Sequence, residues 1–137
     1  MRKSIFAAWL FLFFVVSSIL AASSTYLTCS WSSVYSSGIY YYDTNLLDLS
    51  IVGQCSGDGD DTCPTGIATI TVSKMSGYPP VLVPVDVKNV YFDKYCGESI
   101  GENIYHRNLK DLAGPGYYYW QVGFNGTQLL SSSVGVN

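Results

Sequence analysis

The sequence predicts an all-β protein, an antiparallel β-sandwich with at most one short helix near residues 104–112. Two observations support this fold. Apolar residues recur at every second position in several short segments, and Gly, Pro and Asn residues separate those segments. The chain has 137 residues, which is the length of one domain. We therefore expect about six to eight strands in a single sandwich.

Four predicted strands lie in the first two thirds of the chain. Ala68, Ile70 and Val72 alternate with polar residues, which indicates a strand that buries one face. Valine recurs at every second position around Pro84, and proline cannot donate a hydrogen bond to a neighbouring strand. The strand that contains Pro84 is therefore expected at a sheet edge or at a bulge. The four segments are residues 38–43, 46–54, 67–73 and 81–87.

Asn125 and Gly126 predict a β-hairpin near the carboxyl end. Asn-Gly between two β-prone segments favours a type I′ turn, because that turn needs positive φ at both central residues. The paired segments would be residues 117–124 and 127–136, with Val122 opposite Leu129 and Tyr119 opposite Ser132.

The alternation fails between residues 92 and 116, where a short helix is expected. Asn103 would cap this helix, since asparagine is a favourable N-cap, and the helix would run to about Leu112. Gly114 would end it, and Pro115 would prevent its continuation.

The segment from Asp111 to Tyr119 reads Asp-Leu-Ala-Gly-Pro-Gly-Tyr-Tyr-Tyr. It resembles the approach to a tyrosine corner in immunoglobulin-like domains. The Cys…Trp…Cys core of that family is not reproduced, since no cysteine follows Tyr119. The resemblance implies a sandwich that is immunoglobulin-like in architecture, and it assigns no activity.

Residues 1–22 are predicted to be a signal peptide. A basic pair precedes an apolar run at residues 5–16, and small residues then supply a cleavage site between Ala21 and Ser24. Residues 23–137 would form a single secreted β-sandwich domain. The alternative is an uncleaved anchor, because the apolar run and the small residues together reach the lower length limit of a membrane span.

Composition and charge exclude several classes of function. Charged residues make up 12% of the chain, against a usual ~25%, which argues against a cytosolic enzyme. Downstream of residue 22, five basic residues face ten acidic ones, so the formal charge is −5. Such a domain offers no basic footprint for nucleic acid. No second apolar stretch is long enough to span a bilayer, so the product is expected to be secreted and extracellular.

Cys29, Cys55, Cys63 and Cys96 predict two disulfides in an oxidising compartment. Of the three pairings, Cys55–Cys63 is favoured, because the flexible polar loop between these residues lets its ends meet. Cys29–Cys96 then follows. From loop-closure entropy, we expect the longer link to stabilise the fold by about 4 kcal/mol and the shorter link by about 2–3 kcal/mol. A zinc site is disfavoured, since the chain has no Cys-x-x-Cys pair and a single histidine.

The sequence favours a protein without catalytic activity or cofactor. It has no His-Glu-x-x-His or phosphate-loop motif. His106 is the only candidate general base, and we expect it to be a solvated surface residue. Asp93, Glu98 and Glu102 cluster in sequence, yet spacing alone does not place two carboxylates across a cleft.

The acidic loop that contains Asp58, Asp60 and Asp61 is a weak calcium candidate. Carboxylates at alternating positions on a glycine-rich turn suit a hard cation. The EF-hand pattern fails, because the glycine at the sixth loop position and the distal glutamate are absent. We therefore expect a solvated acidic turn without a metal.

Two aromatic clusters contain candidate ligand-binding residues. Neighbouring residues on a strand point to opposite faces, so each cluster should present a ring to solvent unless both faces are covered. Exposed tyrosine and tryptophan give proteins or sugars a large contact area at low entropic cost. The candidates are Tyr40, Tyr41, Tyr42, Tyr118 and Trp120.

Asn125, Gly126 and Thr127 form the single N-glycosylation acceptor of the chain. The predicted hairpin places Asn125 at an exposed tip, where an attached glycan would meet solvent. We therefore expect a glycoprotein in a host that has the required machinery.

The predicted function is binding. The partner would be a cell-surface or extracellular protein or glycan, and we expect neither nucleic-acid binding nor a stable membrane span after signal removal. The alternative is a structural subunit of an extracellular coat or filament, in which residues 23–37 add as a strand to a neighbour's open sheet edge. Self-association would distinguish the alternative from the first prediction.

Overall fold

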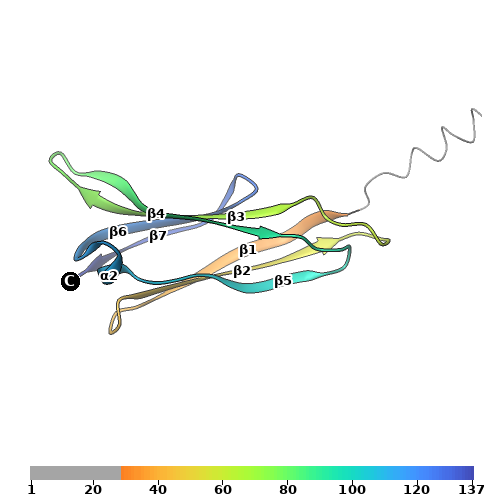
Figure 1. Ribbon diagram of the computed structural model, residues 1–137, viewed down its shortest axis with the longest axis horizontal. Helices are drawn as coiled ribbons and strands as arrows, with labels where there is room; N and C mark the ends of the chain where they lie inside the picture. The colour runs from red at the N-terminus through yellow and green to blue at the C-terminus, as the bar shows by residue number, and fades with distance from the viewer. Residues whose placement is uncertain (1–28) are drawn as a thin grey trace, which may run out of the picture.

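The computed structural model describes residues 29–137, which form two antiparallel sheets packed against each other (Figure 1). One sheet has the strand order β1-β2-β5, and the other has the order β4-β3-β6-β7. A short helix, α2, connects β5 to β6. The predicted immunoglobulin-like β-sandwich is confirmed. The elements are β1 (Ser30–Tyr41), β2 (Leu46–Ser56), β3 (Gly66–Ser76), β4 (Val81–Phe92), β5 (Ser99–Asn108), α2 (Leu109–Ala113), β6 (Gly116–Phe124) and β7 (Thr127–Val136).

Residues 1–28, which include the predicted signal peptide, lie outside the described residues. The signal peptide and its alternative, an uncleaved anchor, therefore stay predictions. Between residues 29 and 137, no helix has the length and apolar character that crossing a bilayer requires.

The core lies between the two sheets and follows from alternation along the strands. Ala68, Ile70 and Val72 of β3 are fully buried, as predicted, and their neighbours are partly exposed. Because successive side chains point to opposite faces, each sheet has one apolar face, and the two apolar faces pack together. The buried residues are Leu47, Leu49, Ile51, Ala68, Ile70, Val72, Phe92, Ile100, Ile104, Tyr105, Leu109, Tyr118, Trp120, Val122, Phe124, Val134 and Val136.

β4 lies at an edge of the four-stranded sheet, as Pro84 predicted. The register of β4 against β3 shifts next to Pro84, so the proline sits at a β-bulge. Asp86 lies opposite Val72 and Lys88 opposite Ile70, which places both charges on the inner side of the strand. A proline, a bulge and inward-facing charges each hinder the addition of another strand to this edge.

The Asn125-Gly126 turn joins β6 to β7 as predicted. Asn125 has a φ of 47° and Gly126 a φ of 83°, both in the positive region that a type I′ turn requires. The expected register is wrong by one residue, because a β-bulge near the turn adds one residue to β7. The observed pairs are Val122–Leu130 and Tyr119–Ser133, in place of pairs with Leu129 and Ser132.

Helix α2 is shorter and begins later than expected. Asn108 caps it in place of Asn103, because the Asn108 side chain accepts a hydrogen bond from the Asp111 N–H at 3.0 Å. Asn103 lies inside β5, whose burial in the core outweighs the local capping preference. Gly114 ends the helix with a φ of 77°, as predicted.

Tyr118 forms the tyrosine corner that the sequence resembles. Its hydroxyl shares its hydrogen between the backbone oxygens of Leu109, at 2.9 Å, and Gly114, at 2.6 Å. Burial raises the pKa of this hydroxyl, so it remains a donor. These bonds join the start of β6 to both ends of α2.

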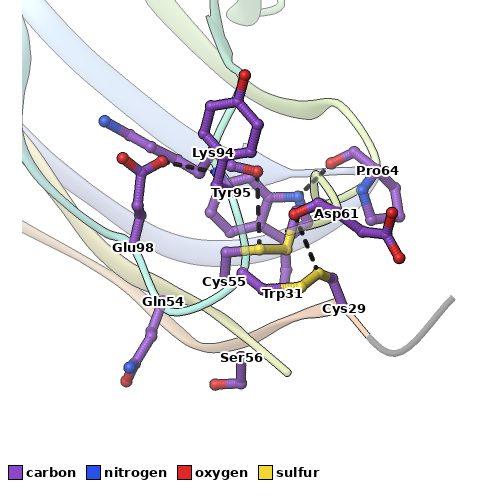
Figure 2. The surroundings of a disulfide bond; sticks show 12 residues. Cys29, Trp31, Gln54, Cys55, Ser56, Asp61, Pro64, Lys94, Tyr95 and Glu98 are labelled. Carbon is purple, nitrogen blue, oxygen red and sulfur yellow. Dashed lines mark hydrogen bonds between the residues drawn. A yellow bond between two sulfur atoms is a disulfide. The ribbon is translucent and has the colours of Figure 1, made fainter. Parts of the chain in front are cut away.

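Two disulfides lie side by side at the other end of the sandwich (Figure 2). Cys29 is bonded to Cys96, 67 residues away, and Cys55 is bonded to Cys63, 8 residues away. These are the pairs that the loop argument favoured. Trp31 packs against the sulfur cluster.

Backbone hydrogen bonds connect the two loops that carry these cysteines. Cys63 donates to the Lys94 oxygen at 2.8 Å, and Cys96 donates to the Asp61 oxygen at 2.9 Å. We call this end, with loops 57–65 and 93–98, the disulfide end. The opposite end, with turns 42–45 and 77–80 and helix α2, is called the free end.

Candidate functional site

The outer face of the β1-β2-β5 sheet carries a row of exposed apolar rings and side chains. Tyr35, Ile39 and Tyr41 of β1 are 56%, 58% and 41% exposed, and they pair with the outward-facing residues of β2. Serine and glycine fill much of β1 between them, and the Ser37 hydroxyl bonds the Ser50 hydroxyl at 2.8 Å. A depression of about 140 Å³ lies among these residues. We use the name tyrosine face for six residues of this surface, namely Tyr35, Ile39, Tyr41, Asp48, Asn103 and His106.

Asp48 is the polar centre of the tyrosine face. Its Oδ1 accepts a hydrogen bond from Asn103 Nδ2 at 2.6 Å, and His106 Nδ1 lies 2.7 Å from the same oxygen. The Asn103 side chain is itself fixed, because its Oδ1 accepts the Tyr105 N–H at 3.1 Å. The carboxylate is therefore held in one orientation before any ligand arrives.

These contacts also keep Asp48 ionised. The hydrogen bond from Asn103, and then the one from His106, lower the pKa of the Asp48 carboxyl. An ionised carboxylate is a strong acceptor for ligand hydroxyl or amide groups. Tyrosine rings beside such an acceptor give a surface that can both stack on a ligand and bond its polar groups.

A groove of about 630 Å³ runs between the edges of the two sheets, next to the tyrosine face. It lies between β4 and β5, and Asn103 lines both this groove and the depression on the tyrosine face. Tyr105 donates its hydroxyl to Asp86 Oδ2 at 2.8 Å across the groove. Burial, and then the bond to Asp86, raise the pKa of Tyr105, so this hydroxyl stays protonated. Lys88 and Arg107 add exposed cations to the walls.

The structure separates the predicted aromatic candidates. Tyr41 and Tyr42 are exposed, whereas Tyr40 is partly buried and donates its hydroxyl to Asn45 Oδ1 at 2.9 Å. The prediction that Tyr118 and Trp120 contact a ligand is corrected, because both rings lie in the core. Their neighbours on the opposite side of β6 carry the outward-facing rings instead.

The acidic loop forms no metal centre. Across residues 29–137, no three His, Cys, Asp or Glu side chains are grouped so that they could hold a metal ion, and this includes Asp58, Asp60 and Asp61. The backbone oxygen of Asp61 accepts a hydrogen bond from Cys96 instead, so the loop is part of the packing around the disulfides.

The other predicted site residues are placed separately from one another. Glu98 accepts the Tyr95 N–H with its Oε2 at 2.7 Å and so stabilises a turn. Asp93 and Glu102 are exposed on a loop and on β5. Asn125 is exposed at the hairpin tip, and its Oδ1 accepts the Ile67 N–H at 2.8 Å.

Sequence reasoning missed most of the tyrosine face. Tyr35 lies before residue 38, where no strand was expected, and Ile39 lies in the expected strand 38–43 but was not a site candidate. Ile39 follows Tyr35 by four residues, and Tyr41 follows Ile39 by two. Even-numbered spacings along one strand place side chains on the same face, so this spacing is the signal that could have identified the three residues. His106 was correctly expected at the surface, but its contact with Asp48 joins residues 58 apart and follows from the sheet register alone.

Comparisons with known proteins support the fold and no more. The sequence matches no family model, and no curated protein is similar to it. The structure is similar to part of a β-glucosidase from Kluyveromyces marxianus, with a TM-score of 0.50 and 15% identity over 77% of this chain. It also resembles part of β-glucosidase 3B from Thermotoga neapolitana, with a TM-score of 0.46, 16% identity and 82% of this chain covered.

The similarity concerns a small part of each enzyme. This chain spans 14% of the Kluyveromyces marxianus chain and 16% of the Thermotoga neapolitana chain. At 15% identity, the similarity to the Kluyveromyces marxianus enzyme shows a shared sandwich fold. The function of this chain is therefore argued from its own surface.

Proposed function

We propose that this protein is a secreted, non-catalytic binding protein whose tyrosine face engages a cell-surface or extracellular glycan or protein. The observation that carries the proposal is the fixed Asp48 carboxylate beside three exposed apolar side chains. A sugar offers hydroxyl groups to the carboxylate and an apolar ring face to the tyrosines, so the arrangement favours a glycan. The rings need little ordering, because tyrosine has few rotatable bonds.

Secretion is supported by the two disulfides, which persist in oxidising compartments. We expect the protein released from eukaryotic cells to begin at residue 22, 23 or 24. Treatment with a glycosidase that removes N-linked glycans should lower its mass, and Asn125→Asp should remove that change. An intact apolar amino terminus on the released protein would contradict the signal-peptide assignment.

Binding can be tested with the oxidised protein on a glycan array and on intact cells. The double variant Tyr35→Ala/Tyr41→Ala should weaken binding at least about tenfold, because it removes two central contact rings. Tyr91→Ala is the matched control, since Tyr91 is also well exposed but lies on β4. Equal binding by both variants would contradict a role for the tyrosine face.

A structural subunit of an extracellular coat or filament is the second candidate. β1 and β7 are edge strands without a charged residue or proline, and such edges accept an added strand more readily than β4 does. The donor strand expected from residues 23–37 needs revision, because residues 30–37 already pair with β2 inside the domain.

Light scattering after gel filtration distinguishes this candidate from the first. Assembly through β7 should give oligomers that grow with concentration, and Ser131→Lys should reduce them by placing a charge on the exposed edge. Val87→Lys on β4 is the control and should leave assembly unchanged. A monomer at all concentrations would contradict the structural role.

A further inference from the structure

The β3–β4 hairpin extends beyond the rest of the sandwich at the free end (Figure 1). The last pair between β3 and β6 is Lys74–Tyr118, so the hairpin beyond this pair consists of two strands alone. Two further residues on each strand, together with the turn 77–80, extend it by roughly 10 Å at ~3.3 Å per residue. We call residues 75–82 the apolar arm.

The apolar arm carries no charge and exposes apolar side chains on both of its faces. No charged residue lies between Lys74 and Asp86. Tyr78 is fully exposed at the tip, and Val81 is 55% exposed. Leu82 pairs with Met75 on the face opposite to Val81, and it is exposed as well. A flat protein partner would cover one face of a hairpin, whereas a fluid lipid phase surrounds both.

The backbone of the apolar arm is also suited to a poorly hydrated environment. Pro79 and Pro80 have no amide hydrogen, so two of the residues at the tip have no donor that needs a partner. In an apolar medium each unpaired backbone group carries a large free-energy cost. The two prolines therefore reduce the cost of moving the tip out of water.

Charge is distributed unevenly between the two ends of the sandwich. The loops of the disulfide end carry five acidic residues and one basic residue, namely Asp58, Asp60, Asp61, Asp93, Glu98 and Lys94. At the free end two acidic residues are balanced by two basic ones, namely Asp43, Asp111, Lys74 and Lys110. A phospholipid surface that meets the free end is therefore remote from the acidic loops, and it meets no net negative charge.

We infer that the apolar arm inserts into the interfacial region of a lipid bilayer and docks the domain on a membrane surface by its free end. The length of the arm matches the ~5–10 Å depth to which interfacial segments enter a membrane. Tyr78 suits this depth, because tyrosine prefers the boundary between headgroups and acyl chains. Docking leaves the tyrosine face, on the outer side of the other sheet, accessible to a partner.

Flotation with phosphatidylcholine vesicles at 0.15 M salt tests this inference on the oxidised protein. The double variant Val81→Asp/Leu82→Asp should lower the bound fraction at least tenfold, because it places two charges in the inserted segment. Val87→Asp is the matched control: Val87 is 57% exposed on the same strand but lies outside the arm. This control should bind within twofold of the parent protein.

A second measurement reports the position of the tip. In the Tyr78→Trp variant, brominated lipids should quench the additional fluorescence, relative to the parent protein, in which Trp31 and Trp120 lie away from the arm. The Tyr35→Ala/Tyr41→Ala variant should bind vesicles normally, so a failure of the proposed function can be told from a failure of this inference.

Three outcomes would overturn the inference. A monomeric parent protein that does not float with vesicles would show that the arm does not enter lipid. Equal flotation of the Val81→Asp/Leu82→Asp variant and the parent protein would show the same. Absence of flotation together with dimers that Val81→Asp/Leu82→Asp abolishes would assign the arm to a second copy of the chain instead.

Discussion

The two ends of the sandwich are closed by different means. At the disulfide end, Cys29–Cys96 and Cys55–Cys63 join loops that carry most of the net negative charge of the domain. At the free end, which has no disulfide, Tyr118 and the Asn108 cap close the structure through hydrogen bonds. Like charges repel, so the acidic loops need links that do not depend on charge. The free end is electrically balanced, and neutral hydrogen bonds suffice there.

The largest expected effect comes from opening the disulfide end. Replacing Cys29 and Cys96 by serine should lower the free energy of unfolding by about 4 kcal/mol, because the link closes a long loop. Replacing Cys55 and Cys63 should cost about 2–3 kcal/mol, since their loop is short. Urea denaturation of both variants measures the difference. A larger loss from the short link would show that loop closure does not explain the stability of this end.

Opening the free end should cost less. Tyr118→Phe keeps the ring in the core but removes the hydroxyl that bonds Leu109 and Gly114. We expect a loss of about 1–3 kcal/mol in unfolding free energy, because backbone oxygens lose a buried donor. Tyr117→Phe is the control and should change stability little, since its hydroxyl bonds Ser133 at the surface. Similar losses in the two variants would argue against the tyrosine corner as the element that closes this end.

The hairpin turn at residues 125–126, where the Asn125 N–H donates to the Ile67 oxygen, tests a closure that uses neither a disulfide nor the tyrosine corner. Gly126→Val should destabilise the protein by about 1–2 kcal/mol, because valine tolerates positive φ poorly. No atom lies within 4 Å of the added Cβ, so the loss would report backbone strain rather than a clash. Gly135→Val on β7 is the control, since that position is equally open and has no positive φ. Thermal unfolding should separate the two variants by several degrees.

The smallest effect is expected at Asp48, on β2 close to the turn 42–45 of the free end. Its pKa is lowered in the folded state, so the carboxylate stabilises the fold above its unfolded pKa, near 4. This contribution is lost as the pH falls through the folded pKa. Asp48→Asn should therefore lower stability slightly at pH 7 and flatten its decline below about pH 4. A parallel decline in the variant would mean that other carboxyl groups account for the acid sensitivity.

The alternating strands and the hairpin turn were predictable from the sequence, because their signals are local. The spacing of Ala68, Ile70 and Val72 determines one face of β3, and Asn125-Gly126 specifies the turn. β5 was missed because a bulge next to Ile104 breaks its alternation, so Asn103 resembled a helix cap. Local preference could not reveal that the core requires a strand there.

The candidate site was less predictable than the fold. The two aromatic clusters were visible in the sequence, but which rings face outward depends on the register of the sheets. Tyr118 and Trp120 point into the core because they share a face with Val122. The contacts of Asp48 with Asn103 and His106 span more than fifty residues, and no sequence spacing indicates them.

The position of the four sulfur atoms has a consequence for the order in which the protein is made. The chain leaves the ribosome from its amino end, so Cys29 meets Cys55 and Cys63 before Cys96 has been synthesised. The β1–β2 pairing places Trp31 opposite Cys55, which brings Cys29 close to the wrong partner early. Thiol–disulfide exchange must then correct any premature bond after Cys96 emerges. We therefore expect a disulfide isomerase to speed the oxidative folding of the reduced chain.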